Sequence, residues 1–466
     1  MLTVQPRIRP GLEPDFLPAG LWNRAFAALV ERDPASRPFA LGLVRGAGDA
    51  SVFHGRVLGP RHPDAKLNDR YAERMLKFLL WQQGGHRVLV AGAPEIAAHL
   101  ALVYRPGGER AFDHEFMGEK IYGHPFSVEA VEFSALPDGR GSGVSLGRHL
   151  EGCRIGFDLG GSDRKVAAVI DGQVVFSEEV AWDPYFQRDP EYHIAGVHES
   201  LLRAAAHLPR VDAIGGSAAG VYVRNEVRVA SLFRGVPPAA FAEKIRPMFR
   251  TLQQRWGGVP FEVANDGEVT ALAGAMALGD NAVLGISMGT SMAGGYVNPD
   301  GQITTWLNEL AFVPVDYRFG APRDEWSGDD GCGVQYFSQQ GVARFATRAG
   351  LVFAEKMPLP ERLAAVQQAM AAGDERARRV YETVGVCLGY ALGQFTGFYE
   401  LRHVLVLGRV TTGRGGDVIV REARRVLETE YPAEAARLRL HLPDEKDKRH
   451  GQAVAAASLP ALRRPA

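Results

Sequence analysis

Apolar residues recur along this chain with two different spacings. Some stretches place them every three or four positions, as amphipathic helices do, and others are short continuous apolar runs that end at glycine, proline or asparagine, as buried strands do. Helices are predicted at 21–32, from Asn68 to Gly84, after Pro94, at 194–207, at 241–255 and, rich in small residues, at 450–462. Strands are predicted at 39–43, 87–91, 128–133, 166–170, 173–178, 211–214 and 261–264. This alternation of strands and helices is typical of an α/β fold.

The pattern changes near residue 151. Before it, Pro, Gly and Arg are frequent and the elements are short, so residues 1–150 are predicted to form a small accessory α/β domain. A winged helix that binds DNA is the alternative for this part, but no basic recognition helix stands out. After it, Asp171-Gly172 lies between two apolar runs and is a two-residue hairpin signal. The first three strands of this second part should therefore be antiparallel.

The composition is that of a folded protein without a strong overall charge. Of the 466 residues, 46% are hydrophobic and 23% are charged, and the formal net charge is -1. Such a balance gives no overall field that recruits nucleic acid or an anionic membrane. The three scattered cysteines are too few for a disulfide framework, and no run approaches the ~20 apolar residues of a membrane span. We therefore expect a cytoplasmic protein.

The first candidate site is a glycine turn after a predicted strand at 154–159. Gly160 and Gly161 let backbone N–H groups come close to an anion, and Ser162 and Lys165 add a hydroxyl and a positive charge. The turn can therefore hold phosphate. Asp158, just before it, would repel a bare phosphate, so a magnesium ion between the two is expected. An ordinary hairpin with a charged tip is the alternative.

The second candidate site is Asn265-Asp266, at the end of the strand at 261–264. A helix of small residues follows it, so both polar side chains should face the adjacent cleft. The alternative is that Asp266 only caps the helix, which is expected to begin near Glu268.

Two further glycine turns follow predicted strands. Gly289, Thr290 and Ser291 end a strand and precede another, which repeats the layout of the first turn. Two phosphate-type turns in separate halves of one chain predict a duplicated fold that holds one polyphosphate from both sides. Gly408 ends a fourth apolar strand before a helix that is expected to begin near Asp417, a geometry suited to a nucleotide base or ribose.

These pieces, in this order, resemble the superfold of sugar kinases, actin and heat-shock ATPases. Within it, the likeness is to the ROK family of bacterial kinases and repressors, which contains glucokinases, fructokinases and N-acetylmannosamine kinases. The likeness covers about residues 153–460. FDLGGSDRK resembles that family's first phosphate loop, AND at 264–266 the segment of its catalytic base, SMGTSMAGG its second phosphate loop, and LGRVTTG its adenosine segment.

The resemblance implies a duplicated ribonuclease-H-like (actin-like ATPase) fold of class α/β, with two kinase lobes and the N-terminal α/β domain. The first lobe would span residues 151–270 and the second 271–466, with the C-terminal helix returning to the first lobe. Three roles are open for residues 1–150: they cover the active site, form a homodimer interface, or brace the kinase lobes.

The segment TWLNELAFVPVDY resembles the family stretch that contacts the sugar. Glu309 matches the family's sugar-binding glutamate, but Phe312 stands where a histidine would bind zinc and sugar. Cys332 is the one cysteine kept from the family's zinc loop, and a structural zinc site needs four protein ligands. We therefore expect no zinc.

The activity implied by the resemblance is phosphorylation of a sugar hydroxyl, in a hexose or related sugar, by ATP with Mg²⁺. Asp266 would be the general base and Asp158 would hold magnesium, while Asn265, Asp266 and Glu309 would contact the sugar. Two other functions compete with this one. One is a non-catalytic sugar-sensing regulator on the same fold, and the other is another ATPase of the superfold.

Overall fold

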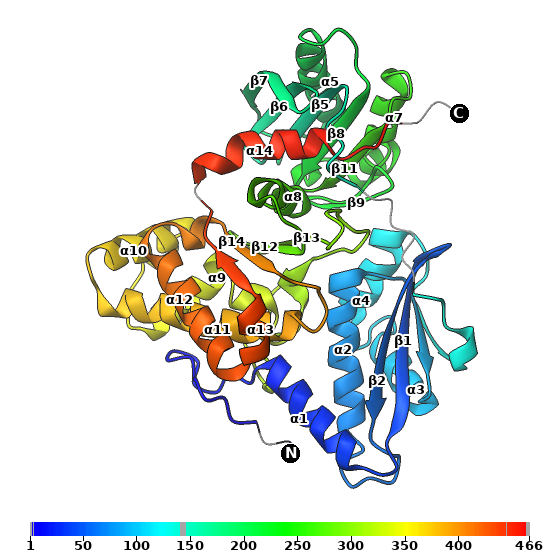
Figure 1. The fold of residues 1–466 in the computed structure, drawn as a ribbon, viewed down its shortest axis with the longest axis vertical. Helices are drawn as coiled ribbons and strands as arrows, with labels where there is room; N and C mark the ends of the chain where they lie inside the picture. Colours follow the sequence, from blue (N-terminus) through cyan, green and yellow to red (C-terminus); the bar gives the residue numbers. More distant parts are fainter. Residues whose placement is uncertain (1, 3, 140–145, 444, 463–466) are drawn as a thin grey trace. The chain divides into compact units, whose positions relative to one another are not determined.

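The chain folds into two compact units (Figure 1). The computed structural model describes residues 2, 4–139, 146–443 and 445–462. Unit 1 comprises Met1–Gly143, Ile286–Gly294 and Thr305–Leu442, and unit 2 comprises Val144–Gly285, Gly295–Thr304 and Pro443–Ala466. The division falls inside β12 (Val283–Met288) and β13 (Met292–Val297), so the chain passes from one unit to the other along these strands.

Unit 2 is built on a five-stranded mixed sheet with the strand order β11-β8-β5-β6-β7. Its strands are β5 (Cys153–Leu159), β6 (Asp163–Ile170), β7 (Gln173–Ala181), β8 (Ala213–Ala218) and β11 (Phe261–Asn265). The prediction of three antiparallel strands is confirmed, because β5, β6 and β7 pair in this way. Asp171 and Gly172 at the turn have φ angles of 47° and 80°, the left-handed region that a two-residue hairpin requires. β5, β8 and β11 run parallel to one another.

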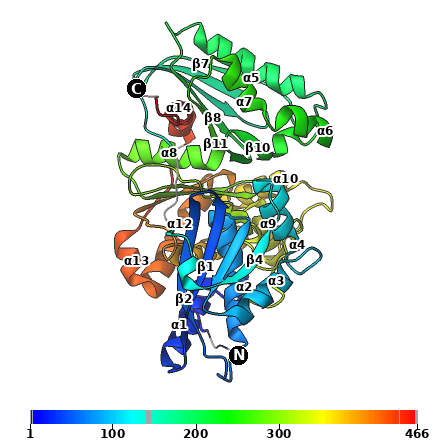
Figure 2. The ribbon, with the colours of Figure 1, turned by 90° about the vertical axis from the view of Figure 1, so that its right-hand side faces the viewer.

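Helices cover both faces of this sheet, as Figure 2 shows. α5 (Pro190–Ala205) and α7 (Met248–Arg255) bury one face, and α14 (Glu445–Ala457) lies on the other, beside α8 (Asp266–Leu278). α14 comes close because the strands present glycines to it. A Cβ atom at Gly156 would lie 1.9 Å from the carbonyl oxygen of Ala453, and one at Gly215 would lie 1.8 Å from that of Ala456. The small-residue helix predicted at 450–462 is therefore confirmed as far as Ala457, where α14 ends, and it packs against β5 and β8.

Two local predictions in unit 2 were wrong. The strand predicted at 211–214 begins at Ala213 and continues to Ala218, so the small residues 215–218 lie within β8. The helix predicted at 241–255 is divided into a π-helical turn, Phe241–Ile245, and α7, which begins directly after Pro247. Proline lacks the N–H that a continuous helix would need at this point. The short elements α6 (Pro238–Ala240), β9 (Val221–Val223) and β10 (Glu226–Val229) complete the unit.

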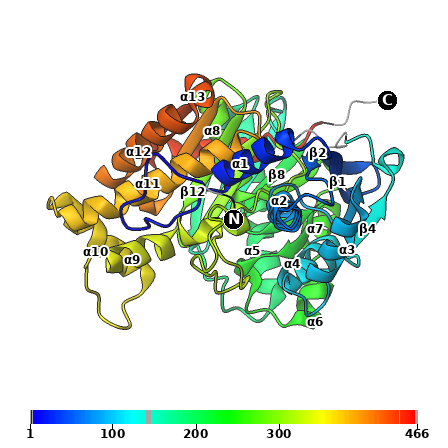
Figure 3. The same cartoon turned by 90° about the horizontal axis from the view of Figure 1, so that it is seen from below.

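Unit 1 contains a second sheet with the strand order β13-β12-β14-β15, in which β14 (His403–Leu407) and β15 (Arg439–His441) are parallel. Its helices are α9 (Gln339–Arg348), α10 (Leu359–Ala371), α11 (Glu375–Phe395), α12 (Arg414–Glu430) and α13 (Pro432–Arg437). α11 lies side by side with α12 (Figure 3). Glycine again permits the close approach, since a Cβ atom at Gly385 would lie 2.6 Å from the carbonyl oxygen of Ile419.

The N-terminal part of unit 1 forms a third sheet with the order β2-β1-β3-β4. Its elements are α1 (Ala19–Arg32), β1 (Arg37–Gly46), β2 (Asp49–Val57), α2 (Leu67–Gln83), β3 (Arg87–Ala91), α3 (Pro94–Val103), α4 (Ala111–Glu115), a π-helix (Phe116–Tyr122) and β4 (Ser127–Val131). The elements predicted from residue 21 to the helix after Pro94 are thus confirmed. The expected domain boundary at residue 150 stays a prediction.

The segment before α1 is held to the rest of unit 1 by polar groups. The hydroxyl of Tyr390 donates to the carbonyl of Ile8 at 2.8 Å, and the buried carboxylate of Glu13 is paired with Arg318, Arg344 and Arg348. Burial alone would raise the pKa of Glu13, but the three guanidinium groups lower it to about 2. Glu13 therefore stays ionised throughout the neutral range. None of the helices in the described part of the chain has the length and apolar character that a membrane crossing requires.

Candidate functional site

In unit 2, Asp158 lies at the end of β5 with three polar neighbours. The hydroxyl of Ser217, on the adjacent strand β8, donates to Asp158 Oδ1 at 2.6 Å. Gln452 of α14 donates from Nε2 to the same oxygen at 3.3 Å and to Ser217 Oγ at 3.2 Å. Lys165 Nζ is 3.9 Å from Asp158 Oδ2. The carboxylate is therefore fixed in orientation by neutral donors and faces one positive charge.

Sequence reasoning missed two of these neighbours. Ser217 lies beyond the end of the strand predicted at 211–214, and the inward orientation of its hydroxyl follows from its lying within β8. Gln452 is 294 positions from Asp158 in the chain, and a partner at that separation leaves no local sequence signal.

The first glycine turn is held in shape by backbone and ring contacts. Gly160 N–H donates to the carbonyl of Asp163 at 2.9 Å, and the indole N–H of Trp182 donates to the carbonyl of Gly160 at 2.8 Å. A Cβ atom at Gly161 would lie 2.1 Å from the hydroxyl of Tyr185, so this position admits only glycine without movement of the ring. The turn is thus a fixed backbone structure.

The side chains of the turn contact carboxylates. Ser162 Oγ donates to Asp163 Oδ2 at 2.9 Å, and Lys165 Nζ donates to Asp163 Oδ1 at 2.6 Å. Lys165 therefore links Asp163 to Asp158, and its own pKa is raised, because these carboxylates outweigh the effect of burial. A phosphate bound here would compete with Asp163 for the ammonium group.

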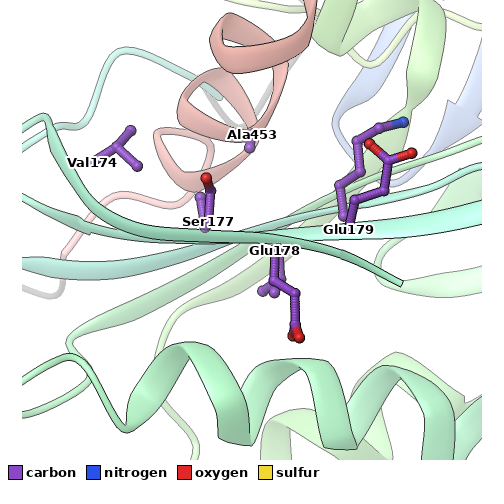
Figure 4. Close-up of a pocket in the computed structure, with 8 residues that line it drawn as sticks. Val174, Ser177, Glu178, Glu179 and Ala453 are labelled. Carbon is purple, nitrogen blue, oxygen red and sulfur yellow. The ribbon is translucent and has the colours of Figure 1, made fainter. Parts of the chain in front are cut away.

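A small groove lies between β7 and α14 beside this turn (Figure 4). Val174, Ser177 and Glu179 point to the side of α14, where Ala453 lies, and Glu178 points to the opposite face. The groove has a volume of about 230 Å³ and Lys165 is among the residues that line it. Pockets for drug-sized ligands are typically about 300–1,000 Å³, so this groove is too small to hold a whole nucleotide.

Asn265 and Asp266 mark the junction of β11 and α8. Asn265 is the N-cap: its Oδ1 accepts the N–H of Gly267 at 2.8 Å, and its Nδ2 donates to the carbonyl of Gly220 at 2.8 Å. α8 begins at Asp266 and not near Glu268, so the capping role that we considered for Asp266 belongs to Asn265. Asp266 Oδ1 still accepts the same Gly267 N–H at 3.0 Å.

Both carboxyl groups at these strand ends have raised pKa values. Burial, followed by the charge of Asp158, raises the pKa of Asp266 to about 6. Burial also raises the pKa of Asp158, although the hydrogen bond from Ser217 and the charge of Lys165 act against it. Two carboxyl groups that influence each other titrate as a pair. Near neutral pH, Asp266 is therefore an ionised carboxylate that retains proton affinity.

In unit 1, the second glycine turn joins β12 to β13. Gly289 N–H donates to the carbonyl of Ser291 at 2.9 Å, and Gln339 N–H donates to the carbonyl of Gly289 at 2.9 Å. Thr290 and Ser291 are exposed. Gly408, with φ of 96°, lies against β12, since a Cβ atom there would be 2.5 Å from the carbonyl oxygen of Met288. The structure thus brings Gly408 to the second glycine turn.

Glu309, also in unit 1, lies at the end of α2. Its N–H donates to the carbonyl of Trp81 at 3.0 Å, and the N–H of Asn308 donates to that of Gln82 at 2.9 Å. Phe312 is buried with its ring centroid 4.3 Å from that of Trp81. A histidine in this apolar position would be poorly placed to bind metal.

Cys332 is buried, with Sγ 3.8 Å from Asp329 Oδ2. Burial raises the pKa of the Cys332 thiol to about 12. Within the described residues, no group of three or more His, Cys, Asp or Glu side chains could hold a metal ion.

Comparison of the sequence with protein-family models and with curated proteins gives no match. Among solved structures, the ROK hexokinase from Thermus thermophilus matches over 65% of this chain and 97% of its own, at 22% identity and a TM-score of 0.51. A ROK family transcriptional regulator, a homolog of the E. coli MLC protein, matches over 66% of this chain and 79% of its own, at 18% identity and a TM-score of 0.50. The chain has the ROK fold. The expected α/β fold class, of the actin-like ATPase type, is thereby confirmed. Because the ROK fold occurs here in a hexokinase and in a regulator, function must be argued from the site.

Proposed function

We propose that this protein is an ATP-dependent sugar kinase of the ROK family, with Asp266 as the general base. The observation that carries the proposal is the pKa of Asp266, which burial and the charge of Asp158 raise to about 6. A general base is most effective when its pKa lies near the working pH. An Asp that served only as a helix cap would need no such shift, and Asn265 already fills that role.

In the proposed reaction, Asp266 accepts the proton of a sugar hydroxyl as that oxygen attacks the γ-phosphorus of ATP, and ADP leaves. General-base assistance typically contributes about 10²–10⁴-fold, and the rest comes from positioning and from neutralising the phosphate charge. In unit 2, the glycine turn at 160–161 and the ammonium group of Lys165 would contact phosphate. In unit 1, the turn at 289–291 would contact phosphate and Gly408 would contact the adenosine.

Asp158 has the properties of a magnesium ligand. Mg²⁺ bound with nucleotide phosphates usually takes one or two carboxylates and keeps several waters. Asp158 fits this pattern as a single carboxylate, because Ser217 and Gln452 orient one of its oxygens. When bound, Mg²⁺ would neutralise charge on the β- and γ-phosphates.

The competing function is a sugar-sensing regulator, and its support is that a ROK transcriptional regulator shares the fold. The raised pKa of Asp266 and the oriented carboxylate of Asp158 favour the kinase, since a sensor needs neither. Sugar-dependent binding of the protein to DNA in a gel-shift assay, without sugar-dependent ADP release, would favour the regulator.

The experiment that tests the kinase is coupled ADP release with Mg²⁺-ATP across a panel of hexoses, amino sugars and polyols. The proposal predicts ADP release that depends on one class of sugar. ADP release of equal rate with and without every sugar would instead indicate another ATPase of the superfold.

The pH dependence of kcat/KM provides a second test. Because Asp266 must be ionised to accept a proton, and its pKa is raised to about 6, kcat/KM for the sugar should be constant at neutral pH and fall as the pH drops through about 6. The profile is measured at saturating Mg²⁺-ATP. If kcat/KM is unchanged at a full pH unit below the pKa of Asp266, the assignment of Asp266 as the base is contradicted.

A further inference from the structure

We propose that the N-terminal part of the chain clamps the loop 308–332 and thereby fixes Glu309, with Asp329 as the positioning residue at the centre of the clamp. We call residues 308–332 the substrate loop. The inference rests on the proposed function for the role of Glu309, and it gives residues 1–150 the bracing role among the three that the sequence left open. Three independent contacts, all within unit 1, support it.

The first contact is between backbones at Glu309 itself. The carbonyls of Trp81 and Gln82 lie in the last turn of α2, where helix carbonyls lack partners within the helix. The N–H of Asn308 donates to the carbonyl of Gln82 at 2.9 Å, and the N–H of Glu309 donates to that of Trp81 at 3.0 Å. Asn308 has φ of 49°, in the left-handed region, and the hydroxyl of Tyr399 donates to its side chain at 2.6 Å. The backbone that presents Glu309 is therefore defined by the end of α2.

The second contact is aromatic. The ring of Phe312 packs against Trp81 and Phe112, with centroid distances of 4.3 Å and 5.6 Å. Trp326, further along the loop, lies 6.1 Å from Phe112 and 5.8 Å from Phe312. The beginning and the later part of the substrate loop thus pack against the same aromatic side chains of the N-terminal part.

The third contact is a buried ion cluster around Asp329. Arg74 Nη1 is 3.2 Å and Lys77 Nζ 3.5 Å from its carboxylate, and Arg110 forms a further ion pair with it. Asp329 is 4% exposed, and these three cations hold its pKa far below the ordinary range in spite of burial. Asp329 is consequently ionised throughout the neutral range.

Further carboxylates balance the positive charges around Asp329, and a hydrogen bond connects this ion cluster to the aromatic contact. Lys77 Nζ also pairs with Asp113 Oδ1 at 2.8 Å, and Arg110 Nη2 pairs with Glu73 at 2.5 Å. The indole N–H of Trp81 donates to Asp113 Oδ1 at 2.7 Å, so the residue that packs against Phe312 is also hydrogen-bonded to the ion cluster. Removing one member of such a cluster leaves an uncompensated buried charge, which is strongly unfavourable.

These contacts make Asp329 the point at which the N-terminal part determines loop position. Three residues within one and a half turns of α2 contact the substrate loop. Lys77 pairs with Asp329, the ring of Trp81 packs against Phe312, and the carbonyl of Gln82 accepts the N–H of Asn308. Without the charge of Asp329, the three cations would repel one another, and α2 would no longer be aligned with Glu309. A shift in Glu309 should then weaken sugar binding more than nucleotide binding.

The test is the Asp329→Asn variant, compared with Arg74→Gln and with Asp33→Asn. Arg74→Gln removes one of the three cations and is the milder change. Asp33 is a buried aspartate in the same N-terminal part, but its carboxylate accepts the N–H groups of Ala35 and Gly59 at 2.9 Å and 2.7 Å and does not contact the loop. It therefore controls for a general loss of stability.

We expect Asp329→Asn to raise KM for the sugar by about tenfold or more, equivalent to about 1.4 kcal/mol of binding, while KM for ATP changes less than about twofold. Hydrogen exchange of the amides of residues 308–312 should become faster, and Arg74→Gln should show both effects to a smaller degree. Asp33→Asn should lower the melting temperature without either effect.

Unchanged exchange at 308–312 in Asp329→Asn, or equal increases of both KM values, would overturn the inference. The exchange measurement does not depend on turnover. If the wild-type protein shows no sugar-dependent turnover, the proposed kinase function fails, and the exchange result still decides whether Asp329 holds the loop.

Discussion

The Asp266→Asn variant is expected to lose at least about a hundredfold of the sugar-dependent rate of ADP formation. Asparagine has the size of aspartate and can still accept the Gly267 N–H, but it cannot take a proton from the sugar hydroxyl. The measurement is kcat at saturating sugar and Mg²⁺-ATP. Because asparagine can still contact the sugar hydroxyl and only proton transfer in the transition state is lost, KM for the sugar should change much less than kcat.

The same substitution should not weaken the fold. The pKa of Asp266 is about 6 in the native protein, above the ordinary value of 3.8, so the native state binds its proton more tightly than the unfolded state does. The tighter binding of this proton stabilises the native state below pH 4, and the stabilisation is lost as the pH rises through about 6. At neutral pH, the asparagine variant should therefore melt at or above the temperature of the wild type.

The matched control is Asp300→Asn, at an exposed turn of the same unit. It makes the same chemical change without touching the strand ends and should keep both activity and melting temperature. Normal turnover in Asp266→Asn would remove the proposed base. Equal losses in both variants would indicate a non-specific effect.

The second large effect is expected from Gly215→Val. A Cβ atom at this position would lie 1.8 Å from the carbonyl oxygen of Ala456, and the obstacle is helix backbone that cannot rotate away. Overpacking of a core typically costs about 1–3 kcal/mol and occasionally more, and we expect about 3 kcal/mol or more here. α14 would have to leave the sheet, and Gln452 would then lose Asp158.

Chemical denaturation followed by circular dichroism measures this change, and the activity assay measures the loss of Gln452 from the site. Gly451→Ala is the control on the same helix, because its nearest obstacle, the Cβ of Ala273, is at 3.7 Å. Alanine is favoured over glycine within a helix, so this variant should be as stable as the wild type or more so. A Gly215→Val protein with wild-type stability would contradict the close packing of α14.

The features that could be predicted from the sequence are those with a local cause. Asp171-Gly172 predicts a hairpin because few residues adopt positive φ, and the strand at 87–91 is continuous and apolar between glycines. The α/β class followed from the alternation of predicted strands and helices, and the superfold from the resemblance of the ordered motifs to the ROK family. The positions of the candidate residues Asp158 and Asp266 at strand ends could be predicted for the same reason, because a polar residue at the end of an apolar run is visible in the sequence.

The features that could not be predicted depend on partners that are far apart in the chain. Ser217 lies beyond the end of the strand predicted at 211–214, because small residues fit turns and close packing equally well and do not show where a strand ends. The pairing of Gln452 with Asp158 requires α14 to lie on β5, and the ion pairs of Asp329 require α2 to meet the loop. In the sequence, Asp329 is part of a polar stretch that is typical of a solvated loop, yet in the structure it is buried among three cations.

The most direct test of the proposed function is transfer of the γ-phosphate itself. The purified protein is incubated with ATP labelled at the γ-phosphate, Mg²⁺ and the sugar that gives the fastest ADP release, and the labelled products are separated. A sugar kinase forms one labelled sugar phosphate for each ADP, and Asp266→Asn forms almost none. Label that appears only as inorganic phosphate, or no turnover while the sugar still raises the melting temperature, would contradict the proposal.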